Sequence, residues 1–140
     1  MALLSIDGLD ELMNDLEAVA EIPDSVASEM LNRQADVVAR AQRARIGEIG
    51  LVDSGMLQRN IRKTGRMIKK GANRSTEVYP QGTRPDGVTN ATVGFIHEYG
   101  ASGRHIPAKN WMLQANEACA AEATEAAREV YNEFLTSKNL

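Results

Sequence analysis

The stretch PAKNWMLQANEACAAEATEAAREVYNEFLTS, residues 107–137, decides the fold. It has a single proline, at its first position, and no glycine. Apolar and small side chains recur along it every three or four residues, which places them on one face of a helix. These residues are Met112, Ala115, Cys119, Ala123, Ala126, Val130 and Phe134. Because alanine dominates the stripe, the sequence predicts a long C-terminal helix, starting near Pro107, that can approach another helix closely.

The expected neighbour of this helix lies in the first third of the chain. Pro23 suits a first helical turn, where its missing N–H would have no partner. The residues after it predict a helix from about Asp24 to Ile46. Its apolar face would contain Val26, Met30, Val37 and Ala41, with Leu31, Ala35 and Val38 beside them. A shorter amphipathic helix is expected before it, from about Gly8 to Ala20. We therefore expect two N-terminal helices, the second packed near the C-terminal one.

The middle of the chain is rich in glycine, which indicates turns and loops there. Ten of the eleven glycines lie between Gly47 and Gly103. A short helix is expected at residues 56–61, after the turn or cap at residues 53–55. Residues 62–70, interrupted by Gly65, and residues 75–79 are the best strand candidates. Residues 81–90 form a polar loop with a turn at Pro85-Asp86-Gly87.

Local propensity leaves residues 90–99 open between helix and strand. Thr89 or Asn90 could cap a helix, on which Phe95 and Tyr99 would lie one turn apart. Gly94 and the β-branched residues of the segment favour a strand instead. The chain as a whole is predicted to be one α+β domain, residues 1–140, with a small antiparallel sheet in the middle.

Composition narrows the functional classes. Hydrophobic residues make up 43% of the chain and charged residues 25%, as in soluble globular proteins. The single cysteine, Cys119, excludes a disulfide within the chain. No secretory signal and no membrane-length apolar stretch is evident. We therefore expect a cytosolic or assembly-type soluble protein.

Charge is distributed in blocks, although the net charge is only −3. Residues 1–32 hold eight acids and no base, and residues 33–74 hold eleven bases and three acids. Such blocks suggest ion pairing within the fold or between copies, or else separately solvated faces. The basic segment 33–74 could instead contact DNA phosphates. It offers no aromatic side chain for stacking on bases, since the first aromatic residue is Tyr79.

The residues that could carry chemistry are few. His97, Glu98 and His105 are close in sequence, but the histidines are eight residues apart, unlike the one-turn spacing of helical zinc motifs. Cys119 lies on the alanine-rich stripe, where a small hydrophobe is expected. We predict no catalytic residue, no metal site and no cofactor. A small enzyme using His97, Glu98 and His105 remains an alternative.

Residues 90–115, NATVGFIHEYGASGRHIPAKNWMLQA, resemble the tail-completion, or head–tail joining, family of long-tailed double-stranded DNA phages. That family shows a short helix ending in an acid–aromatic–Gly triplet, then a loop, then an Ala-Arg-Pro-aromatic run that opens the last helix. The corresponding residues here are Glu98-Tyr99-Gly100 and Ala108-Lys109-Asn110-Trp111, with Lys109 in place of Arg and Asn110 in place of Pro. Weaker similarity extends over most of the chain, including residues 6–16, 54–61 and 80–84. The resemblance favours a helix at residues 90–99.

The resemblance implies a non-enzymatic virion protein of a tailed phage or prophage, assembled in the cytoplasm of the bacterial host. It would join or complete the tail at its head-proximal end as a homo-oligomeric ring, although it could be a monomer in isolation. Its partners would be other tail or connector proteins, with non-specific contact to phage DNA possible and no membrane. A DNA-binding morphogenesis factor using residues 33–74 is the alternative. We expect the interface in two loops, at Gly100, Gly103, Arg104, His105, Ile106, Pro107 and Lys109, and at Arg84 and Asp86.

Overall fold

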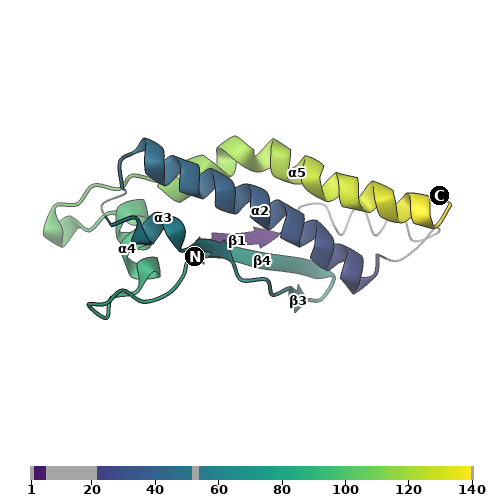
Figure 1. Ribbon diagram of the computed structural model, residues 1–140, viewed down its shortest axis with the longest axis horizontal. Helices are drawn as coiled ribbons and strands as arrows, with labels where there is room; N and C mark the ends of the chain where they lie inside the picture. Colours follow the sequence, from purple (N-terminus) through teal and green to yellow (C-terminus); the bar gives the residue numbers. More distant parts are fainter. Residues whose placement is uncertain (1, 6–21, 52–53, 140) are drawn as a thin grey trace.

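The computed structural model describes residues 2–5, 22–51 and 54–139. Two long helices, α2 (Asp24–Glu48) and α5 (Trp111–Ser137), run antiparallel along the molecule (Figure 1). Side chains join them along this length: Arg40 pairs with Glu122 at 3.0 Å, and Gln42 Nε2 donates to Asn116 Oδ1 at 3.0 Å. The α+β class predicted from the sequence is confirmed. The predicted helix at Gly8–Ala20 lies outside the described residues.

Apolar side chains of both helices form the core. Helix α2 also packs on the sheet, so it lies between α5 and the strands. Met30, Leu31, Val38 and Ile46 are almost fully buried. On α5 the buried stripe follows the predicted one, with one correction: Ala127 is 3% exposed, whereas Ala126 lies at the edge of the core. Ala127 follows Ala123 by four residues and so continues the buried row of Ala115, Cys119 and Ala123 on the same face of the helix, whereas Ala126 lies at the rim of that face.

Strand β4 (Asn73–Pro80) is the centre of the sheet, and every described strand pairs with it in antiparallel fashion. Strand β1 (Ala2–Ser5) lies on one edge, with Ala2 opposite Val78. Strands β2 (Ile61–Lys63) and β3 (Ile68–Lys70) follow each other along the other edge. The predicted strand at residues 62–70 is thus divided into two short strands, and residues 64–67 between them include the predicted interruption at Gly65, which has φ +74°. Strand β1 was not predicted.

Three short elements complete the fold: α3 (Met56–Arg59), α4 (Asn90–Tyr99) and the 3₁₀ turn η1 (Ser102–Arg104). The Thr89 hydroxyl caps α4 by accepting from Thr92 N at 3.1 Å, and Gly100 ends the helix. The helical alternative for residues 90–99 is therefore confirmed. None of the described helices combines the length and the apolar character needed to cross a membrane.

Gly94 explains why a segment with weak helix propensity is helical. A Cβ on Gly94 would lie 2.9 Å from Pro80 Cγ and 3.3 Å from Trp111 Cζ2. The Trp111 indole, fully buried, donates from Nε1 to the Gly94 carbonyl at 2.9 Å. Close packing of α4 between β4 and the start of α5 outweighs the unfavourable propensity of glycine.

Candidate interaction surface

Two loops, one before and one after α4, lie at one end of the molecule (Figure 1). Residues 81–89 precede α4, and residues 100–110 follow it, at the end opposite the C-terminal end of α5 (Figure 1). Both loops contain residues predicted to form an interface. Because α4 connects them, the geometry of α4 decides where both loops project.

Glu98 joins α4 to α5. Its side chain is 4% exposed, and its carboxylate accepts from Met112 N at 2.6 Å and Leu113 N at 3.2 Å. These N–H groups belong to the first turn of α5, which has no partner for them within the helix. A carboxylate there also interacts favourably with the positive end of the helix dipole. Glu98 is therefore a helix cap supplied by another helix.

This cap corrects the predicted start of the last helix. We expected the helix to start near Pro107, but it starts at Trp111. Residues 107–110 instead run back along α4, where Lys109 N donates to the His97 carbonyl at 2.8 Å and Asn110 N to the Glu98 carbonyl at 3.1 Å. Asn110 has φ +51°, which proline cannot adopt. The asparagine found where the resemblance expects proline therefore fits this backbone.

The loop from Gly100 to Lys109 is closed by its own hydrogen bonds. Ala101 N donates to the Ile106 carbonyl at 2.9 Å, and Ile106 N to the Ala101 carbonyl at 3.1 Å, around η1. Gly100 has φ +78°, and a Cβ there would lie 2.8 Å from Ala108 N and from the Ile106 carbonyl oxygen. The expected interface residues divide accordingly: Gly103, Arg104, His105 and Pro107 are exposed, while Ile106 and Lys109 are half-buried.

The loop before α4 is equally ordered. Gly87 N donates to the Arg84 carbonyl at 2.9 Å, which confirms the predicted turn, and the exposed Asp86 accepts from Val88 N at 3.0 Å. The Arg84 side chain points towards α4 instead, where its Nε donates to Oδ1 of the buried Asn90 at 3.0 Å. The two expected interface residues of this loop therefore point to different surroundings, Asp86 to solvent and Arg84 towards α4.

Tyr99 is a candidate contact residue that the predicted interface set omitted. It is 68% exposed, the largest exposure among the large hydrophobic side chains of the described part of the chain. Its ring packs on Phe95, with centroids 6.2 Å apart. The one-turn spacing of Phe95 and Tyr99 indicated a common face, but only the fold shows that this face is open to solvent.

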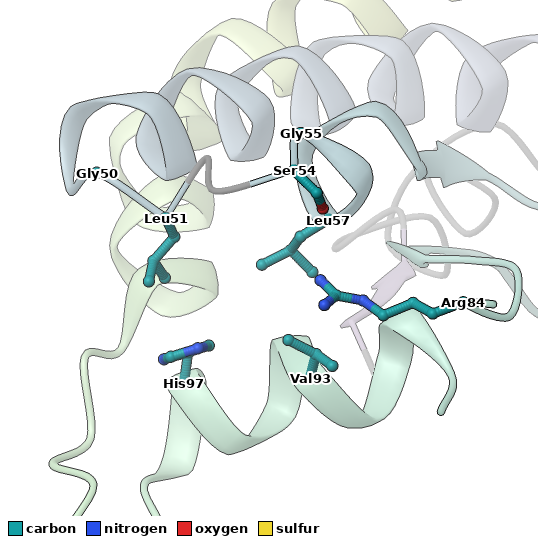
Figure 2. A pocket seen from close by; sticks show the side chains of 8 residues that line it. All are labelled: Gly50, Leu51, Ser54, Gly55, Leu57, Arg84, Val93 and His97. Atoms are coloured by element: carbon teal, nitrogen blue, oxygen red, sulfur yellow. The ribbon is translucent and has the colours of Figure 1, made fainter. Parts of the chain in front are cut away.

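A cavity of about 240 Å³ lies between α4, α3 and the end of α2 (Figure 2). Its lining residues are Gly50, Leu51, Ser54, Gly55, Leu57, Arg84, Val93 and His97. Figure 2 shows Val93 and His97 pointing into it from successive turns of α4, with Arg84 reaching in from the preceding loop. Of these residues only Arg84 was in the predicted interface set. His97 was weighed only as part of a possible metal or catalytic cluster.

His97 has a cationic neighbourhood. Lys109 Nζ lies 3.1 Å from His97 Nδ1, and since an ammonium only donates, Nδ1 accepts this hydrogen bond. Burial lowers the pKa of His97 below its usual 6.5, and the charges of Lys109 and Arg84 lower it further. The neutral imidazole therefore carries its proton on Nε2.

The three residues of the alternative enzyme site, His97, Glu98 and His105, have separate surroundings. Glu98 is committed to capping α5, and His105 is exposed in the following loop. Cys119 is buried, and desolvation raises the pKa of its thiol. Within residues 2–5, 22–51 and 54–139, no group of three His, Cys, Asp or Glu side chains is arranged to hold a metal ion.

Several bases of the segment 33–74 pair with acids of the same chain. Lys69 and Arg74, on the sheet, both bind the carboxylate of Asp24 at the start of α2. Lys63 Nζ lies 2.8 Å from Asp36 Oδ1. The acidic block 1–32 and the basic block 33–74 thus meet within the fold at Asp24, whereas the pair of Lys63 and Asp36 lies within the basic block. The side chains of Arg59, Arg62, Arg66 and Lys70 are exposed.

No protein-family model matches the chain, and searches of curated proteins and of solved structures found no match.

Proposed function

We propose that this protein is a structural virion component of a tailed phage or prophage, which joins or completes the tail at its head-proximal end. It acts without catalysis, as one subunit of a homo-oligomeric ring that contacts other tail or connector proteins. Assembly takes place in the cytoplasm of the bacterial host. Cyclic assembly requires each copy to present two different, complementary patches.

The observation that carries the proposal is the exposure of Tyr99 within the triplet Glu98-Tyr99-Gly100. Glu98 is buried as the cap of α5, and Gly100 is held against the backbone of residues 106–108, so both have structural roles. Tyr99 has no structural role of similar importance, because it is 68% exposed. Large aromatic side chains on a surface are typical anchors of protein interfaces. The resemblance to the phage family rests on this same segment.

Two further features support an interface at this end. The loops on either side of α4 are closed by internal hydrogen bonds, so little conformational entropy is lost when they bind. Arg104 and His105 are exposed at the tip of the longer loop, and Arg104 can make charge-assisted contacts to an acidic partner surface.

A phage complementation assay tests the proposal. The double variant Tyr99→Ala/Arg104→Ser should keep the circular dichroism spectrum and melting temperature of the wild type, because both side chains are exposed. It should yield separated heads and tails. The matched control is Arg128→Ser, an exposed arginine in the C-terminal half of α5, which should give infectious particles at normal yield.

Normal infectivity of the double variant would contradict the proposed joining surface. The alternative, a DNA-binding morphogenesis factor, predicts duplex binding that weakens steeply with salt. Replacing Arg62 and Arg66 by Gln separates the two: loss of duplex binding together with loss of assembly would favour the alternative.

A further inference from the structure

The cavity between α3, α4 and the end of α2 combines apolar walls with a concentration of hydrogen-bond donors. Leu51, Leu57 and Val93 supply aliphatic surface. Arg84 and His97 supply polar side chains to the lining of the same cavity (Figure 2). Among the described residues that line it there is no acidic side chain.

The side chain of Arg84 is held in place by a buried asparagine. Its Nε is fixed by Oδ1 of Asn90, which is 1% exposed and is itself anchored by donating from Nδ2 to the Gln81 carbonyl at 2.9 Å. The described structure gives the two terminal nitrogens of the guanidinium no hydrogen-bond or ion-pair partner. By contrast, Lys69, Arg74 and Lys63 all have carboxylate partners. An arginine fixed through Nε and open at both Nη atoms is suited to a planar, two-oxygen acceptor.

His97 adds a second donor on the same space. Because its Nδ1 accepts from Lys109, the neutral ring carries its proton on Nε2 and can donate from there. The described residues place no acid in an ion pair with Lys109, Arg84 or His97. Among the described residues, the cluster is therefore a local excess of positive charge and donors in a chain whose net charge is −3.

We propose that this cavity is a binding site for a single carboxylate group carried on a short aliphatic stem. The carboxylate would accept from both Nη atoms of Arg84 and from His97 Nε2, and the stem would lie against Leu51, Leu57 and Val93. The volume of about 240 Å³ is below the usual range of about 300–1,000 Å³ for drug-sized ligands, so it suits a group of side-chain size. The site does not depend on the proposed tail function.

Titration of the full chain with butyrate, followed by NMR of the histidine rings, tests this proposal. We expect saturable binding with a Kd on the order of 1 mM for so small a ligand. The His97 resonances should shift and its pKa should rise on saturation, because a bound anion favours the imidazolium. His105, exposed in the next loop, is the internal reference and should not respond.

Variants identify the residues. Arg84→Gln should weaken butyrate binding by at least about tenfold, and Arg84→Lys should weaken it by less, because lysine keeps the charge but loses the planar fork. The matched control Arg104→Gln removes an exposed arginine from the other loop and should leave Kd unchanged. Unaltered melting temperatures show that each variant is folded.

Three results would overturn the proposal: no saturable butyrate binding, equal weakening by Arg84→Gln and Arg104→Gln, or inorganic phosphate binding as tightly as butyrate. Displacement of butyrate by the peptide acetyl-Ala-Glu-Ala-amide would identify the carboxylate as a protein side chain. Exclusion of that peptide would identify it as a free carboxylic acid.

Discussion

Replacing Glu98 by Ala should destabilise the protein more than any surface substitution on α5. The side chain is 4% exposed, and its two oxygens accept from Met112 N and Leu113 N. The variant removes a carboxylate from the positive end of a 27-residue helix and leaves those two donors without a protein partner.

The magnitude follows from the surroundings of the two N–H groups. Met112 is 4% exposed, so its donor would be left unsatisfied in the interior, at a cost of about 1–3 kcal/mol. Leu113 is 51% exposed and water can reach its N–H group, so loss of the hydrogen bond from Leu113 N to Glu98 costs about 0.5–1 kcal/mol. We therefore expect Glu98→Ala to lower the free energy of unfolding by about 2–4 kcal/mol. Glu98→Gln keeps one neutral acceptor for Met112 N and should cost about half as much.

Urea unfolding measures this directly. Trp111 is the only tryptophan and is fully buried one residue before Met112, so its fluorescence reports on the same junction, and circular dichroism reports on the helices. The midpoint should fall without a change in the slope m. The control Glu117→Ala changes an exposed glutamate of the same helix and should stay within about 0.5 kcal/mol of wild type. Equal unfolding free energies for Glu98→Ala and this control would refute the capping role.

Two further predictions concern packing and pH. Ala123 is 6% exposed in the core, so Ala123→Leu should cost about 1–3 kcal/mol by overpacking, whereas Leu at the exposed Ala120 should leave the melting temperature unchanged. Hydrogen bonds from Lys69 and Arg74 lower the pKa of Asp24 below its usual 3.8. A carboxyl group whose pKa is lowered on folding stabilises the fold fully above its unfolded pKa of about 4, and this stabilisation is lost as the pH falls below 4 through the lower folded-state pKa. The gap in melting temperature between wild type and Asp24→Asn should therefore be constant above pH 4 and close below it; a gap that persists in acid would contradict the ion pairs.

The two long helices were predictable because their signal is local. Apolar residues at helical spacing define the buried faces of α2 and α5, and the burial of Met30, Val37 and Ala123 follows that pattern. The interrupted strand at residues 62–70 was predictable for a similar reason, since Gly65 breaks an otherwise extended run.

The candidate sites were harder to predict from the sequence. Two loops were expected to carry contacts, and most of their residues are exposed. The exposure of Tyr99, the capping by Glu98 and the cavity at His97 were not expected. Each depends on which residues face one another across elements, and a single sequence does not contain that information.

The sequence alone determined the class of the fold, the extents of α2 and the far end of α5, and the turn at residues 84–87, because periodicity, glycine and proline act within a few residues. Tertiary structure decided the rest. Strand β1 forms because it pairs with one edge of β4, a strand that lies 70 or more residues later in the sequence. Residues 90–99 are helical because Gly94 lets Pro80 and Trp111 pack against the helix. Helix α5 starts at Trp111, four residues after the proline, because its cap is the carboxylate of Glu98 on another helix, and the free energy of such a contact exists only once the two helices are in place.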